Sequence, residues 1–155
     1  MATSRKKGFT LIEILLVIGI LATLALVVIV ALDPAKRFED ARNSRRLSDI
    51  QSILSAVQQY MVDNKGALPG GVDGNEKQIG TASSGCELTY ADCSANISYC
   101  LDMSSDLARY LKTLPFDPQT GSGEMTHYSI QVDSNGIVTV KACDSTDQSI
   151  SSVSR

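Results

Sequence analysis

The sequence has few of the residues that enzymes commonly use for catalysis. It contains one histidine, His127, and no tryptophan, and aromatic residues make up 5% of its 155 positions. We expect a lone histidine beside Tyr128 to lie at a surface or sheet edge rather than in a catalytic site. The sequence also lacks a G-x-S-x-G elbow, a phosphate-binding glycine loop and an H-E-x-x-H pair. The sequence therefore predicts no catalytic residues and a protein that is not an enzyme.

A broad basic surface is also absent. The formal net charge is -3, and because Arg5, Lys6 and Lys7 are basic, the chain beyond residue 8 carries -6. Proteins that bind nucleic acid usually present a basic patch, so no direct nucleic-acid partner is predicted. The length leaves room for one modest folded domain beside a membrane segment.

A long apolar run lies near the N-terminus. Ile14 to Leu32 has Thr23 as its only polar member, and as a helix it would span about 28 Å, close to the hydrocarbon thickness of a bilayer. A core helix of so small a domain should have a polar face, and this run has none. A removable secretory peptide would have a shorter apolar core and a better cleavage site than Ala31 to Asp33. We therefore expect a membrane-spanning helix.

Charge on either side of this run predicts its orientation. The basic triplet precedes it, whereas Asp33 follows it, and positive charge stays in the cytoplasm. The expected location is a single-pass cytoplasmic (inner) membrane protein whose C-terminal head lies outside the cytoplasm. Glu13 stands out, because a carboxylate inside lipid costs about 2.5 to 3.5 kcal/mol on insertion scales unless it is paired.

The stretch Gly8 to Glu13 (GFTLIE), with basic residues before it and an apolar helix after it, resembles the prepilin signature of type IV pilins and type II secretion pseudopilins. The resemblance implies that a prepilin peptidase cleaves between Gly8 and Phe9, releases the leader 1–8 and methylates the new N-terminus at Phe9. It also implies that the assembly machinery of a pilus or of type II secretion is a partner.

The freed amine of Phe9 gives Glu13 a role. One helical turn separates the two residues, and in an assembled bundle Glu13 of one subunit can pair with the Phe9 amine of its neighbour. Glu13 is then an assembly determinant within the transmembrane and assembly helix, 9–32. The alternative is an acid near the membrane face without a partner.

A second helical stretch, 33–66, is expected to continue the first helix outside the cytoplasm. Asp33 is a candidate N-cap, Pro34 fits the first helical position and marks a kink or break, and Asn64 with Gly66 are stop signals. Apolar residues recur at a spacing of three and four, as in a helix that packs on a domain: Leu47, Ile50, Leu54, Val57 and Met61. Five basic residues of this stretch have two alternative roles: they contact membrane headgroups or the acidic faces of adjacent subunits, or they form a solvated helix surface. They are Lys36, Arg37, Arg42, Arg45 and Arg46.

Residues 67–155 are expected to form a globular head. A high content of Gly, Ser, Asn and Asp predicts a variable loop over 67–98, and a short helix is expected within 103–112. Apolar and polar residues alternate over 128–132 and 138–142, which predicts a β-hairpin. Residues 114–118 (LPFDP) resemble the LPxDP segment of major pseudopilins, without the tryptophan that usually follows. The fold class implied is α+β and pilin-like, with a long N-terminal transmembrane and stalk helix packed on a small antiparallel sheet.

Four cysteines all fall in the predicted head, which suits disulfides in an oxidising compartment. Of three pairings, we expect Cys86 with Cys93 and Cys100 with Cys143. Zinc is disfavoured because the spacing lacks close ligand pairs. Major pseudopilins carry calcium, but no spacing here matches a calcium loop, so no cofactor is assigned. Four acids are candidate oxygen ligands, and we expect them to be solvated instead: Asp117, Glu124, Asp144 and Asp147.

Three functions are consistent with these features. The first is a structural subunit of a type IV pilus-like homo-oligomeric filament, processed by prepilin peptidase and polymerised through its N-terminal helix. The second is the major pseudopilin of a type II secretion system. The third is a membrane-anchored extracytoplasmic binding domain that does not polymerise, in which an acid inside the bilayer brings no advantage.

Overall fold

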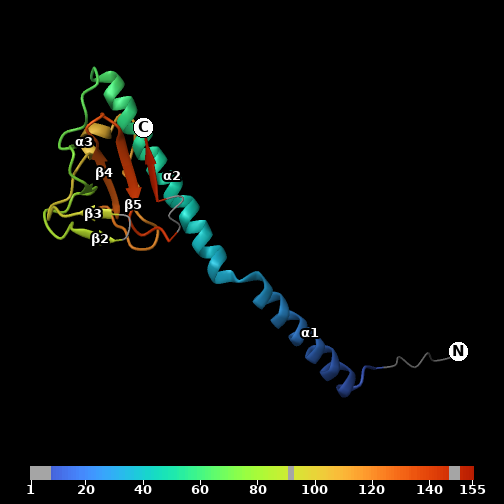
Figure 1. Ribbon diagram of the computed structural model, residues 1–155. Coiled ribbons are helices and arrows are strands. Elements are labelled where there is room, and N and C mark those ends of the chain that lie inside the picture. Colours follow the sequence, from blue (N-terminus) through green and yellow to red (C-terminus); the bar gives the residue numbers. More distant parts are fainter. Residues whose placement is uncertain (1–7, 91–92, 147–150) are drawn as a thin grey trace. The chain divides into compact units, whose positions relative to one another are not determined.

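The computed structural model describes residues 8–90, 93–146 and 151–155, and the chain divides into two compact units, Met1–Glu39 and Asp40–Arg155. The first unit contains α1 (Leu11–Leu32), and α2 (Pro34–Asp63) starts in this unit and continues in the second. The elements that follow form the second unit (Figure 1): β1 (Lys77–Gln78), β2 (Leu88–Tyr90), β3 (Cys93–Ala95), α3 (Ser104–Leu107), β4 (Tyr128–Val132), β5 (Val138–Ala142) and β6 (Ser152–Ser154). The predicted α+β class is confirmed.

The two long helices are separated by a single residue. Asp33 adopts a left-handed conformation, with φ 38° and ψ 73°, because a residue before proline is disfavoured in the right-handed helical region. Its Oδ1 accepts a hydrogen bond from Lys36 N at 3.4 Å. The break at Pro34 and the N-cap at Asp33 were both predicted and are both confirmed.

In the second unit, α2 packs on the sheet through the face that its spacing predicted. The core joins apolar residues of this helix to alternate residues of the central strands (Figure 1): Ile50, Ile53, Leu54, Ala56 and Val57 with Tyr128, Ile130, Val138, Val140 and Ala142. The helix ends at Asp63, and Gly66, at φ 89°, donates from its N–H to Met61 O at 2.7 Å. This bond closes the last turn of a helix in the manner of a glycine C-cap.

The main sheet is antiparallel, with strand order β1-β4-β5-β6. The predicted hairpin is confirmed, since Tyr128 pairs with Ala142 and Val132 pairs with Val138. Asp133 Oδ1 accepts hydrogen bonds from Asn135 N and Ile137 N, both at 2.8 Å, and these bonds close the turn.

Two parts of the head differ from the expected secondary structure. The segment 67–98 contains β1, β2 and β3 in addition to turns. The helix expected within 103–112 is reduced to the four residues of α3, although Tyr110 N and Leu111 N still bond to Leu107 O. Leu107 is buried, as expected for the residue that faces the core.

The predicted disulfide pairing is wrong. The structure joins Cys86 to Cys100 and Cys93 to Cys143. The β2–β3 register places Tyr90 opposite Cys93, so Cys86 lies four residues back along the hairpin, about 13 Å away and beyond the reach of a disulfide. Cys86 N instead bonds to Ser98 O at 3.0 Å, which brings Cys86 beside Cys100.

Candidate functional site in the N-terminal helix

Helix α1 begins at a side-chain cap. Thr10 is extended, with φ -82° and ψ 150°, and its Oγ1 accepts a hydrogen bond from Glu13 N at 3.2 Å. The pair Thr10-x-x-Glu13 has the spacing of a capping box, in which an acid in the first turn also interacts favourably with the helix dipole. From the sequence, Glu13 was expected to be an assembly determinant or an unpaired acid near the membrane face, and this local role was missed although the spacing was its signal.

The whole surface of α1 is open in the isolated chain. None of its 22 residues is buried, and Phe9 and Leu11 are 78% and 82% exposed. Among the described residues, one helical stretch is long and apolar enough to cross a membrane, and it starts at Leu11. At about 33 Å, α1 matches the hydrocarbon thickness. A continuous apolar surface of this size marks contact with lipid or with other proteins.

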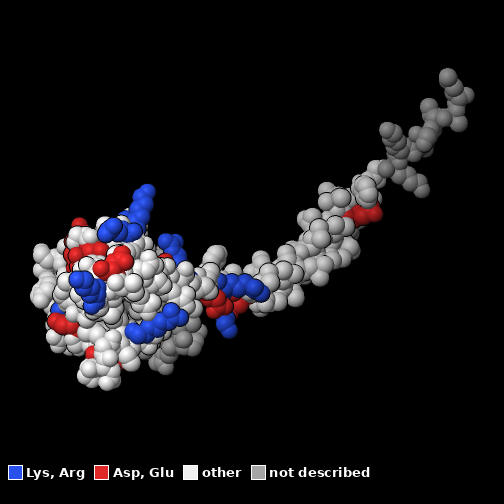
Figure 2. Space-filling model, turned by 90° about the horizontal axis from the view of Figure 1, so that it is seen from above, with Lys and Arg blue, Asp and Glu red and all other residues white. Residues whose placement is uncertain are grey.

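Glu13 is the only ionisable residue of α1, and apart from one acidic residue this helix is white in Figure 2. The one other polar side chain, Thr23, donates from Oγ1 to Ile20 O at 2.8 Å within its own helix. Glu13 is therefore the group through which α1 can recognise a charged partner.

The fold does not require a glycine at the predicted cleavage site. A methyl group added at Gly8 would meet no atom within 4 Å, and the same holds for Gly19 inside α1. A glycine that serves no steric purpose in the chain fits a position where a protease must approach the backbone closely. Residues 1–7 of the predicted leader lie outside the described residues.

The basic residues after α1 have different surroundings. Arg46 is buried, and its Nε and Nη2 both donate to the carboxylate of Asp117. Arg45 is exposed, and its Nε lies 3.8 Å from Oδ2 of the half-buried Asp49, as in a local i,i+4 pair. Lys36 and Arg37 are exposed. The solvated-surface interpretation thus fits Arg45, whereas Arg46 belongs to the interior of the head.

Asp117, expected to be solvated, is in fact buried. Its Oδ1 also accepts hydrogen bonds from Gln119 N at 2.8 Å and Thr120 N at 3.1 Å. Burial raises the pKa of the Asp117 carboxyl, but the bonds from Arg46 and from these two N–H groups outweigh it and hold the pKa below its ordinary value. This ion pair fixes the segment 114–118 on α2.

Among the other candidate calcium ligands, Asp144 lies beside Asp117, since Thr120 Oγ1 contacts both carboxylates. Asp144 Oδ2 lies 2.8 Å from His127 Nδ1 and also accepts a hydrogen bond from Thr120 Oγ1. His127 precedes β4 and is partly buried, as expected for a histidine at a sheet edge. Glu124 is exposed, and Asp147 lies outside the described residues.

One group of potential metal ligands occurs in the described part of the head: Glu76, Cys93 and Cys143. The two cysteines form a disulfide and so provide no thiolate. Glu76 is already bonded to Ser129 Oγ at 2.6 Å and to Lys141 Nζ at 2.9 Å. This group serves the packing of the sheet rather than metal binding.

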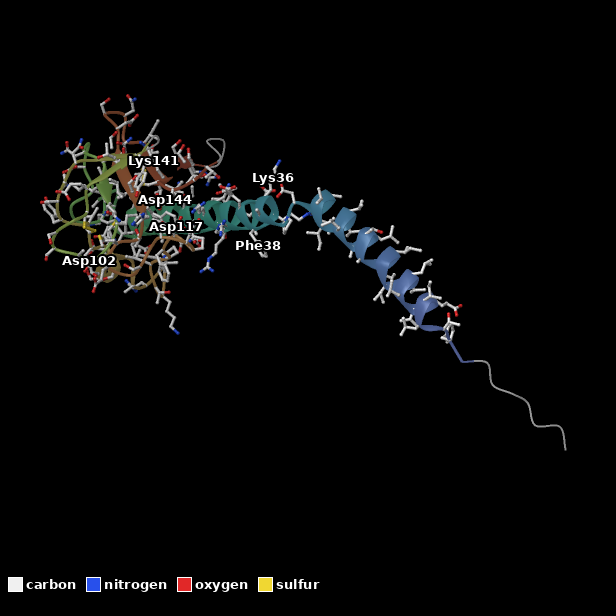
Figure 3. All side chains as sticks on the ribbon, turned by 90° about the horizontal axis from the view of Figure 1, so that it is seen from below. Lys36, Phe38, Asp102, Asp117, Lys141 and Asp144 are labelled. Carbon is white, nitrogen blue, oxygen red and sulfur yellow. A yellow bond between two sulfur atoms is a disulfide. The ribbon has the colours of Figure 1, made fainter. Side chains whose placement is uncertain are left out.

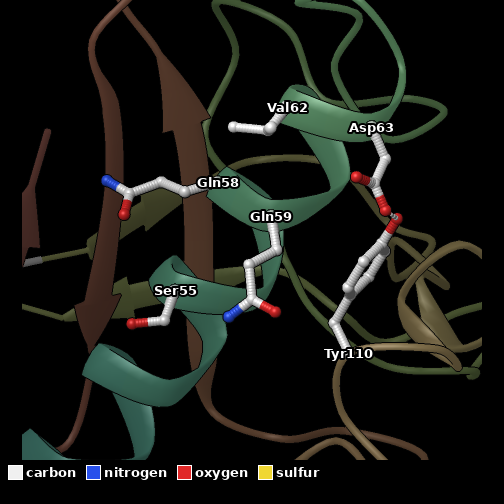
Figure 4. Close-up of a pocket in the computed structure, with 6 residues that line it drawn as sticks. All are labelled: Ser55, Gln58, Gln59, Val62, Asp63 and Tyr110. Atoms are coloured by element: carbon white, nitrogen blue, oxygen red, sulfur yellow. Dashed lines mark hydrogen bonds between the residues drawn. The ribbon is translucent and has the colours of Figure 1, made fainter.

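An open hollow of ≈ 380 Å³ lies along the exposed face of α2 (Figure 4) and is lined by Ser55, Gln58, Gln59, Val62, Asp63 and Tyr110. The hydroxyl of Tyr110 donates to Asp63 Oδ2 at 2.7 Å, and the remaining lining groups are amides, a hydroxyl and a methyl-bearing side chain. The Tyr110–Asp63 bond joins the end of α2 to the segment after α3 at one side of the hollow.

Comparison with known proteins identifies the N-terminal segment. A family model described as the prokaryotic N-terminal methylation motif matches residues 3–29. The N-terminus is a methylation motif. The match covers Gly8, Phe9, Glu13 and most of α1, so the resemblance seen in the sequence is confirmed.

Two curated proteins are similar to part of the chain, and both are named type II secretion system core protein G. The protein from Pectobacterium carotovorum subsp. carotovorum is 45% identical over 60 residues, which are 39% of this chain and 37% of that protein. The protein from Escherichia coli strain K12 is 40% identical over 63 residues, 41% of this chain and 42% of that protein. The chain thus matches about two-fifths of each relative's length. No solved structure matches.

Proposed function

We propose that this chain is a structural subunit of a pilin-like filament, processed by a prepilin peptidase and polymerised through its N-terminal helix. One observation carries the proposal: a methylation motif leads directly into an apolar helix that is exposed along its whole length. Side-by-side packing of such helices from many copies would bury this surface. Contacts between copies that do not close on themselves generate helical filaments.

In this proposal the segments have separate tasks. Cleavage between Gly8 and Phe9 removes the leader 1–8 and frees the amine of Phe9, which is then methylated. Residues 9–32 hold the subunit in the cytoplasmic membrane and later form the filament core. Residues 33–66 and 67–155 form the stalk and the head outside the cytoplasm, where the oxidising environment maintains both disulfides.

Glu13 gives the assembly its register. Inside lipid or a helix bundle an unpaired carboxylate is costly, and the amine of Phe9 from a neighbouring copy supplies the opposite charge. Misplaced neighbours leave both charges unpaired, so the pair favours one stagger between adjacent helices.

The names of the relatives favour the secretion branch. Both similar proteins are core protein G of type II secretion systems, so we propose that the filament is a periplasmic pseudopilus that works with a secretion machinery. A surface pilus is the alternative within the filament class. Deleting the gene distinguishes the two: retention of secreted proteins in the periplasm supports the pseudopilus, whereas loss of surface fibres with normal secretion supports the pilus.

Mass spectrometry of the mature N-terminus tests the processing step. We expect the chain to start at Phe9 with one methyl group on its amine. The variant Gly8→Leu should keep its leader, because a large side chain blocks the approach of a protease to the backbone, whereas Gly19→Ala should be processed normally. An intact leader in the native chain, or cleavage after Leu32, would contradict the filament proposal.

A further inference from the structure

Three exposed residues follow directly after α1. Lys36, Arg37 and Phe38 lie in the first turns of α2, in the same compact unit as α1, and Phe38 is 67% exposed. We propose that these residues, here called the interfacial anchor, bind phospholipid phosphate groups on the outer side of the cytoplasmic membrane. This inference rests on the proposed membrane location of α1.

The position of the interfacial anchor along the chain matches the headgroup layer. Lys36 is four residues beyond Leu32 and Phe38 is six, which corresponds to about 6 and 9 Å along a helix. The headgroup region adds roughly 5 to 7 Å on each side of the hydrocarbon core. When α1 fills that core, Lys36 falls among the phosphates and Phe38 at their outer edge, where it can still pack against headgroups.

Arg37 is held at this level by a bond to the end of α1. Its Nε donates to Leu32 O at 2.8 Å and so satisfies one of the carbonyls that a helix C-terminus leaves without a partner. A guanidinium has five N–H donors, so its remaining donors are available to an acceptor from outside. Phosphate oxygens fit them well, because arginine forms charge-assisted bonds with phosphate.

Lys36 adds a second cation to the same turn. Its side chain forms no ion pair with an acid in the described residues, whereas Lys77 and Lys141 of the head are each paired. Figure 3 shows Lys36 and Phe38 projecting from different sides of α2, as expected for a belt around a helix that enters a membrane. Lys36 and Arg37 lie between Asp33 and the acids Glu39 and Asp40, so they favour the phosphates through direct charge-assisted bonds rather than through a net positive charge.

Phe38 completes the belt. Aromatic side chains are enriched where helices cross the membrane surface, and at the outer edge of the phosphates the Phe38 ring packs against headgroups. A surface of a second copy could also cover Phe38 in a filament. The two cations in the same turn and the short distance to the span favour lipid before assembly.

Because the sequence contains no tryptophan, a Phe38→Trp variant has a single fluorophore at the interfacial anchor. The full chain would be reconstituted in vesicles of phosphatidylcholine with or without phosphatidylglycerol. We expect a blue-shifted emission and strong quenching by lipids brominated near the headgroup. Tyr99→Trp, at an exposed position of the head, is the control and should emit as in water.

Energy transfer from this tryptophan to dansyl-labelled lipid measures which lipid lies beside it. We expect labelled phosphatidylglycerol to be enriched over labelled phosphatidylcholine, and Lys36→Gln and Arg37→Gln should each reduce the enrichment about fivefold. The same substitutions at Lys65 and Arg109, which are exposed in the head, should change nothing.

The outcomes separate this inference from the proposed function. Suppose that alkaline treatment does not extract the chain from the vesicles but that Phe38→Trp emits as in water. The proposed lipid contact of the interfacial anchor is then wrong, while the membrane location stands. If the emission shifts only after filaments form, Phe38 contacts a second copy and the lipid proposal is overturned. Failure to insert at all contradicts the proposed function itself.

Discussion

At the scale of single residues, the most consequential contact in the head joins Arg46 to Asp117. Both side chains are almost fully buried, with 2% and 0% of their surfaces exposed, and a buried charge is costly unless a partner and hydrogen bonds compensate it. Asn43 Oδ1 accepts a further bond from Arg46 Nη1 at 2.8 Å. The contact joins residues 71 positions apart, so it fixes the LPFDP segment on α2 only in the folded chain.

Replacing Asp117 by asparagine should destabilise the head by about 3 to 5 kcal/mol, because it leaves the charge of Arg46 buried without a counter-charge. Denaturant unfolding of the full chain in detergent, followed by circular dichroism, measures this change. Glu87→Gln, at an exposed position of the head, is the control and should fall within about 0.5 kcal/mol of the native chain. A loss below 1 kcal/mol for Asp117→Asn would show that water reaches the pair.

The same pair predicts how stability depends on pH. The folded pKa of Asp117 is lower than in the unfolded chain, so the unfolded state binds the proton first as the pH falls. The stabilisation is complete above the unfolded pKa, about 3.9, and is lost as the pH drops through the folded pKa. The free energy of unfolding should therefore fall as the pH drops from near the unfolded pKa of Asp117 through its lower folded pKa, and Asp117→Asn should flatten part of this fall. An unchanged acid profile in the variant would remove Asp117 from the explanation.

At the scale of elements, hydrophobic periodicity predicted those segments long enough to display it. Helix α2 and the β4–β5 hairpin have repeated spacing of three and four, or of two, over several residues, whereas α1 was predicted from an unbroken apolar run, and each was found where expected. Strands β1, β2, β3 and β6 have two or three residues, too few to show a period. Their positions depend on the strands they pair with, β1 with β4, β6 with β5, and β2 with β3.

The same limit explains the wrong disulfide pairing and the missed burial of Asp117. The register of β2 with β3 decides which cysteines approach each other, and no local pattern specifies that register. Asp117 was expected to be a solvated acid because no spacing around it matched a calcium loop, whereas Arg46 on α2 draws the carboxylate into the interior. Long-range contacts of this kind leave no trace in the neighbouring sequence.

The two disulfides should contribute differently to stability. Cys93–Cys143 spans 50 residues and Cys86–Cys100 spans 14, and in the chain-entropy model these loops correspond to about 4 and 3 kcal/mol. We expect the double variant Cys93→Ala/Cys143→Ala to lose about 1 kcal/mol more than Cys86→Ala/Cys100→Ala. Denaturant midpoints of the two full-length variants in detergent give the comparison. A larger loss for the shorter loop would mean that packing of the cysteines, rather than loop entropy, controls the effect.

At the scale of the whole molecule, the two units solve different problems. The head buries its own apolar residues between α2 and the sheet and needs no partner for its core. The unit that contains α1 has no buried residue in that helix, so its stability depends on lipid or on other copies. In the proposed function, one chain therefore passes between two environments, and the only ionisable group of α1 must be tolerated in both.

Glu13 has two candidate roles, a cap for its own helix and a counter-charge for a neighbouring copy, and two substitutions separate them. Glutamine can replace glutamate in a capping box, so Glu13→Gln keeps the local role and removes only the charge. Thr10→Val removes the 3.2 Å capping bond and keeps the charge. If the counter-charge drives assembly, Glu13→Gln should lower filament yield at least tenfold, whereas Thr10→Val should lower it far less.

The membrane step supplies the control that makes this comparison decisive. Glu13→Gln removes a carboxylate that costs about 2.5 to 3.5 kcal/mol inside lipid, so its insertion should equal or exceed that of the native chain. Sheared filaments counted by electron microscopy and membrane levels measured by immunoblot report the two steps separately. Normal insertion with few filaments supports pairing of Glu13 with another copy. Equal filament yields from Glu13→Gln and the native chain would leave capping as the role of this residue, and a similar loss in both variants would point to the stability of the first helical turn.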